Sequence, residues 1–252
     1  MADTDLKPSF IKQITERIEG LESLGKRAGF STALLLIGAG IGRLAVNTSA
    51  DSSQLQNRSI SGNQILACII EICLTLLAVY GYAHSSQRRL QRWGEGKLSQ
   101  PAEQDRSWLK EEYRQQARRY LLQLLGAGIT WLLSLLIYFI LRRGLNATES
   151  TAVFVLLLTV GLGVYLHIKS SFGFYGWQLA LRAVRQPASP EDTKGLRAML
   201  KFGAVLWTCL TIAYLILGLH LHQWTNTWLL YPIAGLTYCL LLTWSVAIRG
   251  LH

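Results

Sequence analysis

Charge and hydrophobicity occupy different stretches of this 252-residue chain. Nearly all lysines and arginines fall into three short blocks, and the long stretches between them carry almost no charge. A soluble fold spreads its charges over every surface helix, whereas a bilayer requires uninterrupted apolar segments of about 20 residues. Half of the residues are hydrophobic and only 16% are charged. The pattern therefore predicts an all-α, polytopic integral membrane protein.

Six apolar runs are long enough to cross a hydrocarbon core of about 30 Å. They belong to a single transmembrane domain that covers residues 1–252. Their approximate bounds are 29–46, 64–84, 120–141, 151–167, 202–221 and 228–248. The first and fourth runs are short, so these two spans are expected either to tilt little or to include flanking residues.

The distribution of basic residues predicts the orientation of the spans. If the N-terminus is cytoplasmic, 21 of the 25 lysines and arginines lie on the inner side. Most of these belong to the N-terminal segment 1–28 and to the loops 85–119 and 168–201. The outer side keeps only Arg43, Arg58, Arg142 and Arg143. This positive-inside bias predicts that both termini are cytoplasmic.

Each predicted pair of spans follows a basic segment with helix-forming composition. These segments are 12–27, 107–119 and 192–201, and the second reads SWLKEEYRQQARR. The sequence therefore predicts three helical hairpins, each preceded by a basic amphipathic cytoplasmic helix. Such helices favour anionic lipid headgroups by roughly 1 kcal/mol per basic side chain near the surface. The formal charge of +10 is explained by this arrangement, and nucleic acid is not predicted as a partner.

Glu71 is the most unusual residue in the apolar runs, because it lies in the segment ILACIIEICLTLL. A lone carboxylate there costs several kcal/mol unless it is protonated, paired or hydrated, which makes it a candidate functional residue. Arg43, near the outer end of the first run, is its expected partner. The pair is interpreted either as a structural link between helices or as part of an ion or proton path. Nearby, Gly38 and Gly42 form a small-residue surface that favours close helix contact.

Two further sets of residues are weaker candidates. His84 and His167 end the second and fourth runs, and facing imidazoles could hold haem or a pigment. Interfacial histidines are the alternative reading, because neither residue lies deep within a run. Pro232 and Gly235 predict a kink or a hinge in the sixth run. The four cysteines lie inside apolar runs without metal-ligand spacing, and no metal site is predicted.

Three functional classes remain open. The first is a non-catalytic scaffold, assembly factor or accessory subunit that binds a membrane-protein partner or forms a homo-oligomer. The second is a small transporter or channel whose path passes Glu71 and Arg43, and the third is a haem or pigment binder. An enzyme is not expected, because no hydrolase, zinc-protease or nucleotide-binding motif occurs and the cytoplasmic loops are too short for a catalytic domain.

Overall fold

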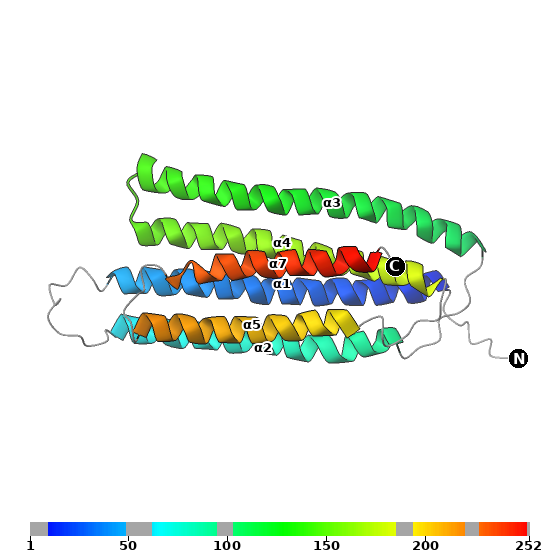
Figure 1. Cartoon of the computed structure of the whole chain (residues 1–252), viewed down its shortest axis with the longest axis horizontal. Coiled ribbons are helices and arrows are strands. Elements are labelled where there is room, and N and C mark those ends of the chain that lie inside the picture. The colour runs from blue at the N-terminus through cyan, green and yellow to red at the C-terminus, as the bar shows by residue number, and fades with distance from the viewer. Residues whose placement is uncertain (1–9, 49–61, 95–102, 185–193, 220–226, 251–252) are drawn as a thin grey trace, which may run out of the picture.

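The structure is a computed structural model that describes residues 10–48, 62–94, 103–184, 194–219 and 227–250. It contains six long helices, which confirms the all-α prediction (Figure 1). They are α1 (Phe10–Thr48), α2 (Gly62–Gly94), α3 (Glu103–Phe139), α4 (Glu149–Ala183), α5 (Lys194–Leu219) and α7 (Leu230–Gly250). A short π-helix, η1 (Ile140–Gly144), continues the end of α3.

Three helical segments in the described part of the chain are long and apolar enough to cross a membrane. They are Glu103–Gly144, Glu149–Ala183 and Lys194–Leu217. Shorter apolar segments lie in α2, at Cys68–Tyr82, and in α7, at Leu230–Val246. These lengths and compositions indicate an integral membrane protein. The full set of six spans stays a prediction.

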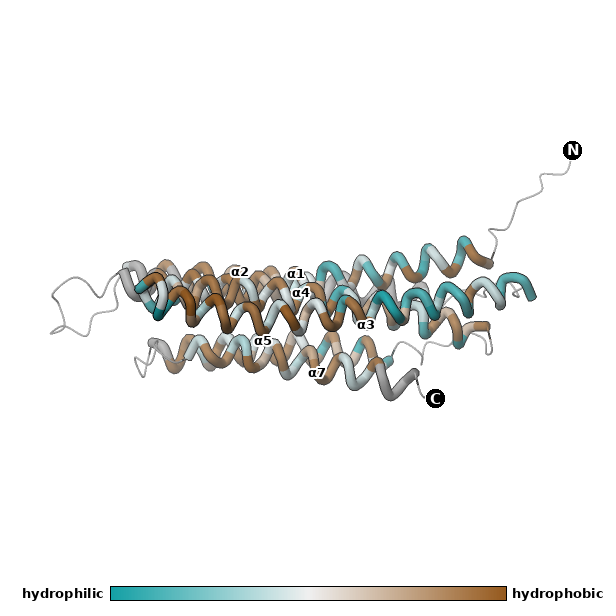
Figure 2. The backbone as a smooth tube through the Cα atoms, turned by 90° about the horizontal axis from the view of Figure 1, so that it is seen from above, coloured by the Kyte–Doolittle hydropathy of each residue, from teal (hydrophilic) through white to brown (hydrophobic). Residues whose placement is uncertain are grey.

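The helices extend well beyond the predicted spans. At 1.5 Å per residue, the 39 residues of α1 reach about 58 Å, roughly twice the thickness of a hydrocarbon core. The predicted basic segments and the apolar runs that follow them are therefore parts of the same helices. Figure 2 shows the consequence, because hydrophilic residues gather at the end of the bundle where α1 and α3 begin.

Helix α4 occupies the centre of the packing. It contacts α1 most extensively and is also contacted by α3 and α7, while α2 packs between α1 and α5. Consecutive helices run in opposite directions along the bundle (Figure 1). The contacts of α5 with α2 are more extensive than those with α7. The helices of different predicted hairpins therefore also contact one another, and the hairpin arrangement stays a prediction.

Glycines at positions 25 and 29 let α1 approach α4 closely. A Cβ atom on Gly29 would lie 2.9 Å from the carbonyl oxygen of Tyr165, and one on Gly25 would lie 2.5 Å from Cβ of Phe172. Both distances are shorter than real side chains adopt, so α1 and α4 can meet here only because both positions lack a side chain.

The apolar face of the N-terminal part of α1 is packed against other helices, while Lys12, Lys26 and Arg27 are exposed. Ile14, Leu21 and Leu24 are at most 1% exposed. Ile18 and Leu21 lie against Gly176 of α4, about nine residues beyond the end of the predicted fourth span. The extended ends of α1 and α4 therefore bury their apolar faces on each other. The sequence alone identified the amphipathic face but not what covers it.

The connection between η1 and α4 is a tight turn. Asn146 adopts a φ of 50°, a left-handed conformation that asparagine tolerates better than most residues. Thr148 is the N-cap of α4, where its hydroxyl accepts a hydrogen bond of 3.3 Å from the backbone N–H of Thr151. This cap fixes the first turn of α4, and with it the position of Glu149.

Candidate functional site

Glu71 lies in α2 at the junction of several helices and is only 1% exposed. Its Oε1 accepts a 2.5 Å hydrogen bond from the hydroxyl of Tyr231 in α7. Its other oxygen, Oε2, faces α1, where a Cβ atom on Gly38 would lie 2.5 Å away. Gly38 thus provides the space that the carboxyl group occupies, and Glu71 joins α1, α2 and α7.

Two threonines extend this cluster to α5. The hydroxyl of Thr75 donates a 2.8 Å hydrogen bond to the backbone carbonyl of Glu71 and lies 3.1 Å from the hydroxyl of Thr211. Tyr231 also reaches Thr211, at 3.4 Å. The Tyr214 ring packs edge-on against Tyr231, with ring centroids 5.2 Å apart. We call Glu71, Thr75, Thr211 and Tyr231 the Glu71 cluster.

Arg43 is paired with a different acid from the one expected. Its guanidinium donates to Oε1 of Glu149 at 3.2 Å, so the predicted Glu71–Arg43 pair is replaced by an Arg43–Glu149 pair. The physical reason is solvation: the Arg43 side chain is 7% exposed, but that of Glu149 is 41% exposed and keeps contact with the outside.

Tyr231 and the two threonines were not identified from the sequence as partners of Glu71. Tyrosine at the end of an apolar run is typical of the interfacial aromatic belt, which gives no reason to place this side chain inside the bundle. One signal was present: the depth of Glu71 requires a donor from another helix. Which helix supplies this donor depends on which helices pack against α2, and the residues of one span do not determine that.

His167 lies in α4 and faces α7. Its Nε2 is 2.8 Å from the Thr243 hydroxyl and 3.1 Å from the Cys239 carbonyl, and its ring stacks on Trp131 with centroids 5.6 Å apart. These contacts occupy the nitrogen that most readily binds a haem iron. His84 lies in α2, but its side chain is outside the described residues.

Pro232 lies in the first turn of α7, and the helix continues without a break from Leu230 to Gly250. Proline is well accommodated there, because the N–H groups of a first turn have no partner within the helix. Helix α7 is therefore not interrupted at Pro232, and the kink stays a prediction. Gly235 lies one turn later and packs near Val164 and Trp207. Whether the two residues act as a hinge stays a prediction.

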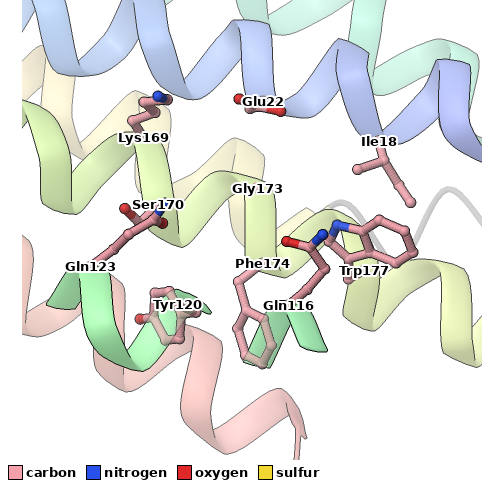
Figure 3. A pocket seen from close by; sticks show the side chains of 10 residues that line it. All are labelled: Ile18, Glu22, Gln116, Tyr120, Gln123, Lys169, Ser170, Gly173, Phe174 and Trp177. Carbon is pink, nitrogen blue, oxygen red and sulfur yellow. The ribbon is translucent and has the colours of Figure 1, made fainter. Parts of the chain in front are cut away.

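A separate cavity of about 110 Å³ lies between α1, α3 and α4 (Figure 3). Its walls combine polar and aromatic side chains. They are Ile18, Glu22, Gln116, Tyr120, Gln123, Lys169, Ser170, Gly173, Phe174 and Trp177. The Tyr120 and Phe174 rings stack with centroids 4.6 Å apart and form one wall. No sequence motif predicted this cavity, because its residues come from three distant segments.

Together these features define a class: an all-helical integral membrane protein with a buried carboxyl cluster and a polar cavity outside that cluster. Comparisons with protein-family models, with curated proteins and with solved structures found no match for the chain. The functional argument therefore depends on the geometry of these residues.

Proposed function

We propose that this chain is a non-catalytic integral membrane protein that acts as a scaffold, assembly factor or accessory subunit of a membrane complex. In this proposal its helices form six spans, arranged as three consecutive hairpins with both termini in the cytoplasm. The basic residues beyond the spans face the anionic headgroups of the cytoplasmic leaflet. The proposed partner is another membrane protein or a second copy of this chain.

The observation that carries the proposal is the uncovered apolar side of α3. Only 11% of an apolar stretch of 18 residues within Glu103–Gly144 is buried inside the protein, compared with 56% of the corresponding stretch of α4. Large side chains such as Leu132, Leu135 and Leu136 are between 51% and 70% exposed. Gly126 and Gly128 on the same helix have no atom within 4 Å of the position that a Cβ would take. Small residues beside exposed leucines permit a second transmembrane helix to approach closely.

The Glu71 cluster supports the same proposal. Its carboxyl group is bound by a tyrosine and enclosed by glycine, threonine and aromatic side chains, which is the arrangement of a link between helices. The described cavity lies elsewhere and has no residue of the cluster in its lining.

A transporter or channel is the second candidate, and one observation favours it. Within the described residues, Oε2 of Glu71 is buried and has no hydrogen-bond partner. A buried carboxyl oxygen of this kind is able to accept a proton or a cation. A haem or pigment site is not proposed, because Nε2 of His167 is engaged by Thr243 and Cys239.

The partner role is tested by Gly128→Leu on the exposed side of α3. We expect the substitution to reduce co-purification of the partner, or of a differently tagged second copy, from gently solubilised native membranes. The reason is that a leucine side chain would hold the partner helix away from α3. Gly20→Leu is the matched control, since a Cβ at Gly20 also meets no atom within 4 Å but lies in the N-terminal part of α1. A wild-type protein that always purifies alone would contradict the proposal.

The orientation is tested by single cysteines at the two ends of the α3 segment, introduced into a cysteine-free background. We expect Ala147→Cys to react with a membrane-impermeant maleimide in intact cells. Glu103→Cys, which is at an exposed position, is expected to react only after permeabilisation. The opposite labelling pattern would place the N-terminus outside, and equal labelling of both sites would mean that α3 does not cross the membrane.

A further inference from the structure

The cavity between α1, α3 and α4 lies at the boundary between apolar and polar parts of the helices. Tyr120 begins the apolar run of α3, and Lys169 follows directly after the apolar run of α4. Glu22 lies seven residues before the start of the apolar run of α1. All three helices therefore change character around the cavity, at the level where lipid headgroups meet a membrane protein.

The shape of the cavity is set by the way the helices pack. Both α1 and α3 pack on α4, and α4 supplies the floor of the cavity through Ser170 and Gly173 (Figure 3). A Cβ atom on Gly173 would meet only Cγ of Glu22, at 3.8 Å. The missing side chain at Gly173 therefore leaves open space in the cavity. A volume of about 110 Å³ has room for several water molecules, each of which needs roughly 10–15 Å³, or for a small polar group.

Lys169, a half-buried residue, contributes the basic side chain in the lining of this cavity. Glu22, the acid in the same lining, forms its ion pair with Lys26 at 3.2 Å. Within the described part of the chain, Lys169 has no ion pair of its own. The three groups carry a net charge of +1, which favours one negative charge in the cavity. A second negative charge would meet the Glu22 carboxylate, so a singly charged phosphodiester fits better than a phosphate monoester.

The remaining polar groups are amides and hydroxyls, not charges. Gln123 and Tyr120 can each both donate and accept hydrogen bonds. The Ser170 hydroxyl donates to the Leu166 carbonyl, and Nε2 of Gln116 donates to Glu112, so these two groups are available mainly as acceptors. That chemistry complements the hydroxyl groups of a polyol. An ammonium headgroup would instead require a free carboxylate, and the carboxylate of Glu22 is held by Lys26. Next to the cavity, Leu121, Leu122 and Leu125 of α3 are exposed and would lie along acyl chains.

From this geometry we infer that the cavity binds one phospholipid whose phosphodiester is followed by a hydroxyl-bearing headgroup, such as glycerol or inositol. Lys169 contacts the phosphate, and the amides and hydroxyls contact the headgroup. The acyl chains follow the apolar surface of α3. This site goes beyond a general attraction of basic helices to anionic membranes, because it requires particular residues and a fixed stoichiometry. It does not depend on the proposed partner role.

The test uses the full-length protein reconstituted in nanodiscs that contain phosphatidylcholine with a minor fraction of phosphatidylglycerol. Native mass spectrometry after release from the nanodisc counts the lipids retained by each protein molecule. We expect one phosphatidylglycerol to remain on the wild-type protein. Lys169→Gln should lower its apparent affinity about tenfold, equivalent to about 1.4 kcal/mol, because the substitution removes a charge-assisted hydrogen bond to the phosphate. Gly173→Leu should abolish retention by filling the cavity.

Arg27→Gln is the matched control, because it removes an exposed basic side chain of α1 that neither lines the cavity nor pairs with Glu22. It should retain the lipid at no less than one third of the wild-type affinity. Equal losses for Lys169→Gln and Arg27→Gln would overturn the proposal in favour of unspecific surface attraction. Should Gly173→Leu fail to fold, the comparison of the Lys169 and Arg27 variants still decides the question, with melting temperature as the folding control.

Two further experiments test whether the ligand is a lipid or a soluble phosphate compound, and which headgroup it carries. Inorganic phosphate and glycerophosphoglycerol, added in solution at millimolar concentration, should not displace the retained lipid. Displacement by either would identify a site for soluble phosphate compounds and overturn the lipid assignment. Replacing phosphatidylglycerol with phosphatidylethanolamine should lower retention. Equal retention of the two lipids would overturn the inferred preference for hydroxyl-bearing headgroups.

Discussion

Replacing Gly29 with leucine is expected to lower the free energy of unfolding by about 3 kcal/mol. A Cβ atom at this position would lie 2.9 Å from the backbone oxygen of Tyr165 and 3.3 Å from its Cα. Backbone atoms cannot move aside by changing a rotamer, so α1 and α4 would have to separate. Because this contact is the most extensive in the protein, the loss should spread along both helices.

The measurement is unfolding of the purified protein in mixed detergent micelles, followed by circular dichroism. Gly128→Leu is the matched control, since it makes the same chemical change in another apolar helical segment where no atom lies within 4 Å of the new Cβ. We expect that variant to unfold like the wild type when purified, although it should weaken the partner contact. Equal stability of the Gly29 and Gly128 variants would show that α1 and α4 do not pack as described.

Replacing Tyr231 with phenylalanine is expected to cost about 2–3 kcal/mol, the second large effect. The change removes the hydroxyl that binds Oε1 of Glu71, and it leaves the buried carboxyl group without its donor. Glu71→Gln should cost less than about 1 kcal/mol, because its amide oxygen still accepts the Tyr231 hydroxyl and its volume is nearly the same. The polar link between α2 and α7 would therefore survive that substitution.

A double-mutant cycle isolates the interaction. In a Glu71→Leu background, Tyr231→Phe should cost little, because no acceptor for the hydroxyl remains on Glu71. A coupling energy of about 1–3 kcal/mol is expected between the two positions. Strict additivity would mean that the hydrogen bond does not contribute to stability, and the structural role of the cluster would be lost.

Glu71→Gln also distinguishes the two functional candidates. If the cluster is only a link between helices, the variant should retain both folding and partner binding. A wild-type ion or proton flux in liposomes that disappears in a stably folded Glu71→Gln protein would instead favour the transporter. The comparison is informative because the substitution removes the titratable proton while it keeps the shape of the side chain.

The sequence predicted the helical class and the unusual position of Glu71 because both depend on local patterns. An apolar run of about 20 residues needs a helix, and a carboxylate inside it needs a partner. It did not predict the pairing of Arg43 with Glu149, the donor Tyr231 or the cavity beside Lys169. Each of these depends on which helices are neighbours, and packing order is a property of the whole bundle.

The glycines show the same limit in more detail. Gly38 was assigned to close helix contact from its spacing, and it does face α2, where it makes room for Glu71. Gly29 lies at the start of the first predicted span and Gly25 lies four residues before it. Neither was predicted to make a close helix contact. They are nevertheless the glycines of α1 at which an added Cβ would lie closest to atoms of α4. Spacing identifies a small surface, but the partner surface decides which glycine is required.

The place of α4 has a consequence for biosynthesis. This helix is translated before α5 and α7, yet its His167 is covered by Thr243 and Cys239 of α7. A ribosome must therefore deliver almost the whole chain before that histidine gains its partners. Until then His167 lacks its hydrogen-bond partners from α7. Packing around α4 therefore depends on α7, and loss of its 21 residues, Leu230–Gly250, would leave His167 without these partners.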